Sequence, residues 1–147
     1  MKYAVIAFTR AGSRYAVRIS EAMRERGADC EAFGKGKEAE AWGVHPVQES
    51  LRNWTEKGFR ECDGLIFVGA AGIAVRAIAP FVQSKASDPA VLCMDEQGHF
   101  VISLLSGHLG GANELTREIA LLCGAVPVIT TATDAGGRFS VDDFARR

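Results

Sequence analysis

An alternation of short apolar runs with longer amphipathic segments constrains the fold of this chain more than any other feature. The segments 13–27 and 112–124 each carry apolar residues at helical spacing and end in glycine. Strand-like runs lie between and around them, at 3–8 (YAVIAF), 29–33 (DCEAF), 64–69 (GLIFVG), 90–94 (AVLCM), 99–105 (HFVISLL) and 126–131 (VPVITT). This order predicts a three-layer α/β fold, with an open, mostly parallel sheet and helices on both faces.

Two further segments complete the expected order of elements. Pro46 is expected to start a modest helix that runs through Leu51 and Trp54 toward Phe59. The runs 90–94 and 99–105 flank the turn sequence DEQG and predict an antiparallel hairpin, so the sheet should be mixed.

Composition limits the classes of protein. With 147 residues, 48% apolar and 24% charged, the chain suits one soluble domain. The formal net charge of −1 gives no basic field for nucleic acid, and no apolar run reaches the roughly 20 residues that span a bilayer. The four cysteines have no paired C-x-x-C spacing, so we expect reduced thiols, a cytoplasmic location and no metal site: Cys30, Cys62, Cys93 and Cys123.

The first candidate site is the junction FVGAAGIAVR (67–76), where a strand passes through Gly69 and Gly72 into a helix. Small residues at a helix start leave backbone N–H groups open to an anion, although tight packing alone also explains such glycines. Arg76 falls about one turn into this helix, where its guanidinium can pair with a carboxylate. We expect all three residues to bind substrate.

The second candidate site is LLSGHLGGANE (104–114), which joins strand 99–105 to the next helix. His108 is the candidate catalytic base, because a loop imidazole with a pKa near 6.5 transfers protons at neutral pH; a loop-fixing hydrogen bond is the alternative. The expected substrate-binding residues around it are Ser106, Gly107, Gly110, Gly111 and Asn113. Ser106 and Asn113 also suit helix-entry caps.

A third loop, TTATDAGGR (130–138), adds Thr131 and Asp134 as substrate-binding candidates, with a domain-closing turn as the alternative. We expect the strand at 99–105 to run parallel to that at 64–69. Both glycine junctions would then open at one sheet edge, where ligands bind in open α/β sheets. If the strand at 90–94 is the parallel one instead, the junctions fall on opposite ends and no composite site forms.

Three stretches together resemble the amino-terminal part of the CbiG family, the cobalt-precorrin-5A hydrolases of anaerobic cobalamin biosynthesis. They are LIFVGAAGIAVRAIAPFV, DPAVLCMDEQGHFVISLLSGHLGGANELTREIA and VPVITTATD, and they occur in the family's order and spacing. The resemblance is strongest over 64–134. It implies a CbiG-like domain over 1–139, with 140–147 leading toward a carboxyl-terminal module for which this chain has no room.

The resemblance implies hydrolysis of the δ-lactone of a cobalt-bound tetrapyrrole, with release of acetaldehyde and ring contraction. Cobalt then belongs to the substrate, no cofactor is expected, and His108 would act as base or contact the cobalt axially. The chain would be the hydrolase itself, or a substrate-binding half completed by a carboxyl-terminal module in trans. The alternative is a flavodoxin-like nucleotide- or phosphate-binding module that shares only the fold.

Overall fold

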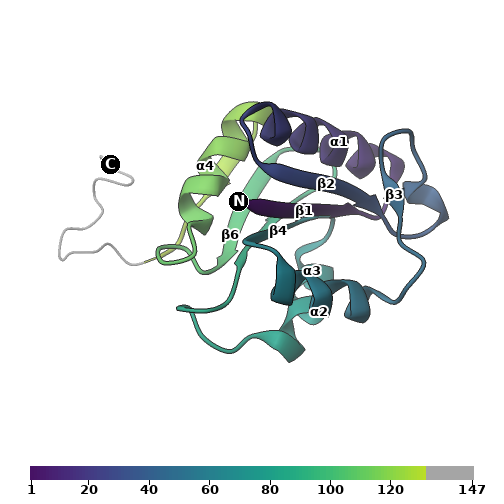
Figure 1. Ribbon diagram of the computed structural model, residues 1–147. Coiled ribbons are helices and arrows are strands. Elements are labelled where there is room, and N and C mark those ends of the chain that lie inside the picture. The colour runs from purple at the N-terminus through teal and green to yellow at the C-terminus, as the bar shows by residue number, and fades with distance from the viewer. Residues whose placement is uncertain (132–147) are drawn as a thin grey trace.

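The computed structural model describes residues 1–131, which form a seven-stranded sheet in the order β3-β2-β1-β4-β5-β6-β7 (Figure 1). The strands are β1 Lys2–Ala7, β2 Asp29–Gly34, β3 His45–Pro46, β4 Gly64–Val68, β5 Ala90–Met94, β6 Phe100–Leu105 and β7 Val126–Val128. The helices are α1 Arg10–Glu25, α2 Leu51–Glu61, α3 Ala71–Ile78 and α4 Ala112–Cys123, with short 3-10 turns η1 Lys37–Ala39 and η2 Ala79–Phe81. The three-layer, mostly parallel architecture expected from the sequence is confirmed.

Strands β3, β2, β1, β4 and β5 are parallel to one another, and the strand order reverses between β1 and β4. The chain leaves β1 toward β2 on one side, and later leaves β4 toward β5 on the other side. Ligands of doubly wound sheets bind at such a switch point, outside the carboxyl ends of the strands. The β1–α1 and β4–α3 junctions therefore flank the expected binding crevice.

The predicted hairpin is confirmed, because β5 and β6 pair antiparallel across the turn at 95–99. The direction expected for β6 is wrong: β5 is parallel to β4, so β6 and its parallel neighbour β7 run the opposite way. The physical reason is the connection, since α3 lies between β4 and β5 and completes a βαβ crossover, which places parallel strands side by side. A hairpin then reverses β6.

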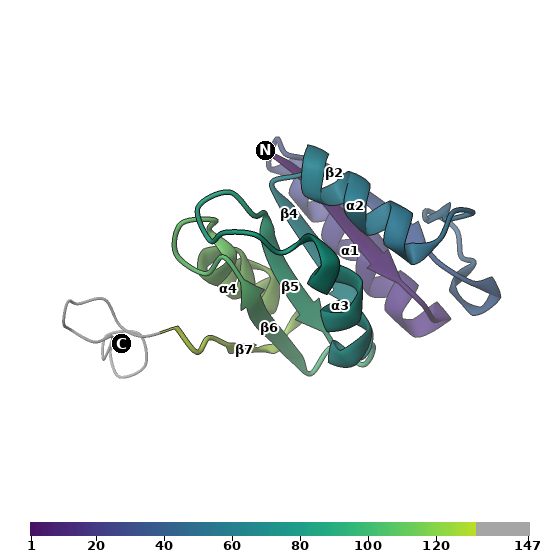
Figure 2. The ribbon, with the colours of Figure 1, turned by 90° about the horizontal axis from the view of Figure 1, so that it is seen from below.

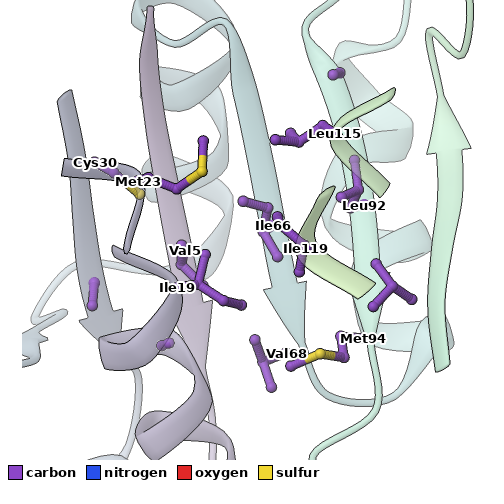
Figure 3. Close-up of a cluster of buried hydrophobic side chains, with 14 of the residues drawn as sticks. Val5, Ile19, Met23, Cys30, Ile66, Val68, Leu92, Met94, Leu115 and Ile119 are labelled. Atoms are coloured by element: carbon purple, nitrogen blue, oxygen red, sulfur yellow. The ribbon is translucent and has the colours of Figure 1, made fainter. Parts of the chain in front are cut away.

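Two apolar clusters lie on opposite faces of the sheet. On one face α1 and α4 bury Ile19 and Ile119 against Val5, Ile66 and neighbouring strand residues (Figure 3). On the other face α2 and α3 bury Trp54 and Ile78, with small alanines between them, against residues such as Ile6 and Phe67. Each helix therefore contributes one apolar stripe, and the stripe of α1 is the one that the periodicity of 13–27 predicted.

The boundaries differ from the sequence predictions at two places. Pro46 ends the two-residue strand β3, and α2 begins only at Leu51, because the Ser50 hydroxyl caps it by accepting a hydrogen bond from Asn53 N–H at 3.1 Å. The last strand stops at Val128, earlier than expected. The predicted segment 140–147 and the domain limit at 139 lie outside the described residues.

Candidate anion site at the carboxyl edge of the sheet

Helix α3 begins with unsatisfied backbone donors. Its N-cap residue, Ala70, has no side chain that can cap the helix, and the carbonyl oxygen of Ala70 accepts from Ile73 at 3.0 Å. Within residues 1–131, the N–H groups of Ala71 and Gly72 donate no hydrogen bond. Both residues are exposed. The start of α3 therefore presents two free donors and the positive end of the helix dipole to solvent.

The Arg76 side chain folds back over this helix start. Its Nη1 atom lies 3.2 Å from the position that a Cβ on Gly72 would occupy. Among the described residues, no carboxylate lies within 4.0 Å of this guanidinium. Because Gly72 has no side chain, the Arg76 guanidinium has room above the helix start. This guanidinium has no acidic partner within residues 1–131. The structure thus brings Gly72 and Arg76 together, as the sequence analysis expected.

The β1–α1 junction lies directly beside the β4–α3 junction. A Cβ on Gly69 would stand 3.0 Å from Phe8 Cδ2, and one on Gly12 would stand 3.3 Å from Val68 Cγ1. The Thr9 hydroxyl caps α1 by accepting from Gly12 N–H at 3.0 Å, while the N–H groups of Arg10 and Ala11 have no acceptor within residues 1–131. Two helix starts therefore lie side by side at the carboxyl edge of the sheet.

The sequence analysis did not identify the β1–α1 junction as a candidate site. The stretch FTRAG (8–12) has the features of the first: a strand end, a small residue at the helix start and an arginine, Arg10. Arg10 is exposed, and no acidic side chain of the described residues pairs with it. The signal that identifies it is topological, because a switch point brings the first and fourth strands together.

The glycine-rich loop 106–111 lies at the opposite edge and is tightly packed. A Cβ on Gly107 would stand 2.7 Å from Thr131 Cγ2 and 2.8 Å from Asn113 Oδ1. A Cβ on Gly110 would stand 2.5 Å from Ser106 Cβ, and Gly111 has a φ of +82° as the N-cap of α4. Close packing and backbone conformation therefore account for all three glycines.

Asn113, in the first turn of α4, holds this loop in place through two side-chain hydrogen bonds. Its Oδ1 accepts a hydrogen bond from the Ser103 hydroxyl at 2.8 Å, and its Nδ2 donates to Thr131 Oγ1 at 2.9 Å. Ser106 has a φ of 62° and donates its hydroxyl to the Asp88 carbonyl at 3.1 Å. Ser106 and Asn113 are buried, and neither is the helix cap expected from the sequence, because Gly111 takes that position.

The start of α4 has little open donor capacity, unlike that of α3. The N–H groups of Gly111, Ala112 and Asn113 donate to loop carbonyls at 3.3, 3.1 and 3.0 Å. His108 is exposed at the tip of the loop. A cleft of about 580 Å³ opens beside the loop and is lined by Tyr3, Gly110, Gly111, Glu114, Leu115, Arg117 and Glu118, among others. Burial, together with the Asp63 carboxylate, raises the pKa of the Tyr3 phenol above its ordinary value.

The two predicted junctions do not share a cleft. Gly69 follows the carboxyl end of β4, whereas Ser106 contacts Asp88, just before the start of β5. The five residues of β4 separate these edges by about 16 Å, at roughly 3.3 Å per residue. The composite site that joined His108 to Arg76 is therefore wrong, because β6 is antiparallel to β4. Asp134, which the sequence added to the site, lies outside the described residues.

The cysteines and the other histidines lie in surroundings that favour structural roles. Burial raises the pKa of the Cys30 thiol to about 12 and that of Cys93 to about 11. His45 pairs with Glu31 at 2.7 Å on the surface.

Within residues 1–131, no cluster of three or more His, Cys, Asp or Glu side chains is placed to bind a metal ion. No helix in the same range is long and apolar enough to cross a bilayer.

These features define a doubly wound α/β domain with a candidate anion site at its switch point. Comparison with known proteins gives a narrower assignment. Residues 53–134 match the family model described as Cobalamin synthesis G N-terminal, CbiG_N, over more than half of the chain. The chain belongs to this family, as the sequence motifs indicated.

Relatives with curated names agree with the assignment. The chain is 52% identical over 103 residues to a cobalt-precorrin-5A hydrolase of Salmonella typhimurium, covering 70% of this chain and 29% of that protein. It is 41% identical over 146 residues to a protein of the same name from Priestia megaterium, covering 99% of this chain and 39% of that protein. The chain therefore spans less than two fifths of the length of these relatives.

A solved structure supports the fold. The crystal structure of a putative cobalamin biosynthesis protein G homolog from Sulfolobus solfataricus matches with a TM-score of 0.69. The match has 23% sequence identity and covers 90% of this chain and 38% of that one. At this identity the likeness shows that both proteins share the fold.

Proposed function

We propose that this chain is the substrate-binding part of a cobalt-precorrin-5A hydrolase in cobalamin biosynthesis. In this reaction water attacks the lactone carbonyl, the ring C–O bond breaks to give a carboxylate and a hydroxyl, and a two-carbon unit then leaves as acetaldehyde. The names of the relatives support the hydrolase class. The cobalt enters with the tetrapyrrole substrate, and the site at the carboxyl edge of the sheet would recognise only the organic periphery.

One observation carries the binding proposal: the free Ala71 and Gly72 N–H groups lie beneath an arginine that has no acidic partner among the described residues. A carboxylate at this position accepts hydrogen bonds from the backbone and pairs with the guanidinium, and the helix dipole adds attraction. The neighbouring start of α1, with Arg10, offers a second donor group for another carboxylate. Peripheral carboxylates of a tetrapyrrole suit such a paired arrangement.

His108 is a separate proposal, because it lies at the other edge. The cleft of about 580 Å³ beside its loop favours this location for chemistry. There the exposed imidazole of His108 would deprotonate the attacking water or contact the cobalt of the substrate. The amides of residues 111–113 are not available to stabilise an oxyanion there, since each already donates to a loop carbonyl.

The alternative function is a flavodoxin-like phosphate binder, because free N–H groups at a helix start also bind phosphate. Parallel titrations of the chain with a cobalt corrinoid polyacid, with inorganic phosphate and with flavin and adenine nucleotides distinguish the two. The proposal expects tight binding of the polyacid and at most weak binding of the phosphates. Preferential binding of a nucleotide would contradict the proposal.

Turnover tests the reaction itself. Cobalt-precorrin-5A is incubated with this chain alone, and with a complete chain in which residues 1–147 replace the matching part of the Priestia megaterium relative. Acetaldehyde is measured in both. We expect release by the complete chain, and an inactive complete chain that still folds would contradict the assignment of this domain to the hydrolase.

A further inference from the structure

Strands β6 and β7 leave an apolar strip on the face of the sheet that carries α2 and α3. Phe100 and Val126 are paired across the two strands and are 49% and 55% exposed. The next pair on the same face, Ile102 and Val128, is partly exposed. These four residues, here called the β6–β7 patch, contain no charged or polar side chain.

The patch exists because the two faces of the sheet are covered unequally. On the opposite face, α4 packs over β6 and β7, and Val101 between the patch residues is completely buried there. On the patch face α2 and α3 pack against residues of β1, β4 and β5. Figure 2, seen from that side, shows β6 and β7 lying beside these helices with no helix in front of them.

The free edge of β7 is less suited to binding than its face. Val126 N–H donates to the His99 carbonyl of the adjoining strand at 2.8 Å, so the backbone of the following residue, Pro127, points to the open edge. Proline has no N–H, and the edge therefore lacks its central donor for pairing with another strand. A partner for this region is expected to pack on the side chains of the patch.

The relatives are much longer than this chain, and their further sequence is the candidate partner for the patch. The matched family model describes an amino-terminal part, and this chain spans 29% and 39% of two relatives, so most of each relative consists of further sequence. The chain continues from Thr131, three residues beyond β7, and Thr131 is held against the loop by Asn113. The chain therefore leaves the described domain within three residues of β7, and any carboxyl-terminal part follows from there.

We propose that the β6–β7 patch is the docking surface for the carboxyl-terminal part of the CbiG protein, in the same chain or as a separate chain. Exposed apolar patches on soluble domains mark interfaces, and domains joined by a short connection bury such surface against each other. The inference depends on family membership and on the fold, and it holds whatever reaction the protein catalyses.

The test uses the complete chain described above, with a protease site introduced after Arg147. After cleavage, association of the two parts is measured by gel filtration and by titration of one part with the other. The double variant Phe100→Lys, Val126→Lys places two charges on the patch. Trp42→Lys is the matched control, because Trp42 is 87% exposed in the loop before β3, at the other end of the sheet.

We expect the unmodified parts and the Trp42→Lys parts to stay together, and the double variant to associate about tenfold more weakly or worse. Circular dichroism of the 147-residue chain checks that the variant folds. If it does not, Phe100→Ala, Val126→Ala takes its place, with a smaller loss of association expected. Equal association of the control and the patch variants would overturn the proposal. So would a dimer of the 147-residue chain that the patch substitutions dissociate, because a second copy would then cover the patch.

Discussion

The Nη1 atom of Arg76 lies 3.2 Å from where a Cβ on Gly72 would stand, so the arginine occupies the space above a helix start that has no side chain. The Arg76 guanidinium therefore lies close to the free N–H groups of Ala71 and Gly72, at the start of the same helix. A carboxylate bound there has three donors on one side. In the proposed anion site, position 72 has a role in binding as well as in packing.

Gly72→Ala should weaken binding of a cobalt corrinoid polyacid without destabilising the fold. The added methyl group meets only the end of the flexible Arg76 side chain, which has to move, while alanine favours the helix by about 0.5–1 kcal/mol. Affinity and urea unfolding are measured together. Gly107→Ala is the control, because its methyl group meets Thr131 and Asn113, and it should cost about 1–3 kcal/mol of stability. Unchanged affinity in Gly72→Ala would remove position 72 from the site.

Arg76→Lys keeps the charge but loses the planar pair of donors. We expect the polyacid to bind about tenfold to hundredfold more weakly, since a hydrogen bond to a charged group is worth about 1.5–3 kcal/mol. Arg76→Ala should lose at least as much, and the difference between the variants should shrink at high salt. If the wild type and both variants bind equally, Arg76 is a solvated helix residue and plays no part in binding.

The sequence predicted the layers, the helices and the hairpin well, because each depends on local periodicity or a local turn. The run 90–94, for example, matches β5 without error. The pairing of Arg76 with Gly72 was also predictable, because residues four apart lie on one face of a helix. The packing role of the loop glycines was not predictable from the sequence. Gly107, for example, packs against Asn113 and Thr131, and such contacts depend on how distant segments pack.

The direction of β6 was predictable from connections rather than from composition. A helix between two strands, as α3 between β4 and β5, makes them parallel, and a short turn then reverses the following strand. The expectation that two anion-binding junctions lie together favoured the wrong topology. The same reasoning about connections would have found the β1–α1 junction and Arg10, which no local motif singled out.

His108→Ala should leave the fold intact, because the imidazole is exposed at a loop tip, and exposed substitutions usually change stability by less than about 0.5 kcal/mol. In the complete chain, the base proposal predicts a fall in kcat of about 10²- to 10⁴-fold. Affinity for the polyacid should not change, because the carboxyl-edge site lies at the other end of β4. An unchanged kcat would reject catalysis by His108, and a loss of more than roughly 2 kcal/mol of stability would show a structural role.

Stability should decrease at alkaline pH through Cys30. The folded chain keeps this thiol protonated up to about pH 12, whereas the unfolded chain releases the proton near the ordinary pKa of 9.0. Above pH 9 the unfolded state therefore binds fewer protons, and the free energy of unfolding falls by up to about 1.4 kcal/mol per pH unit for this group. Urea unfolding of the wild type and of Cys30→Ala at pH 8 and pH 10 isolates the effect. Equal pH dependence in the two proteins would contradict it.

The edge of the sheet that binds the substrate is tested most directly by backbone amide chemical shifts of the isotopically labelled chain, titrated with a cobalt corrinoid polyacid. Because the two edges lie about 16 Å apart, the shifts distinguish them without any mutation. The account predicts the largest shifts at residues 10–12 and 70–73, with the Arg76 side chain following the same binding curve. Shifts confined to residues 106–114, or no shifts at saturating polyacid, would contradict binding at the carboxyl edge.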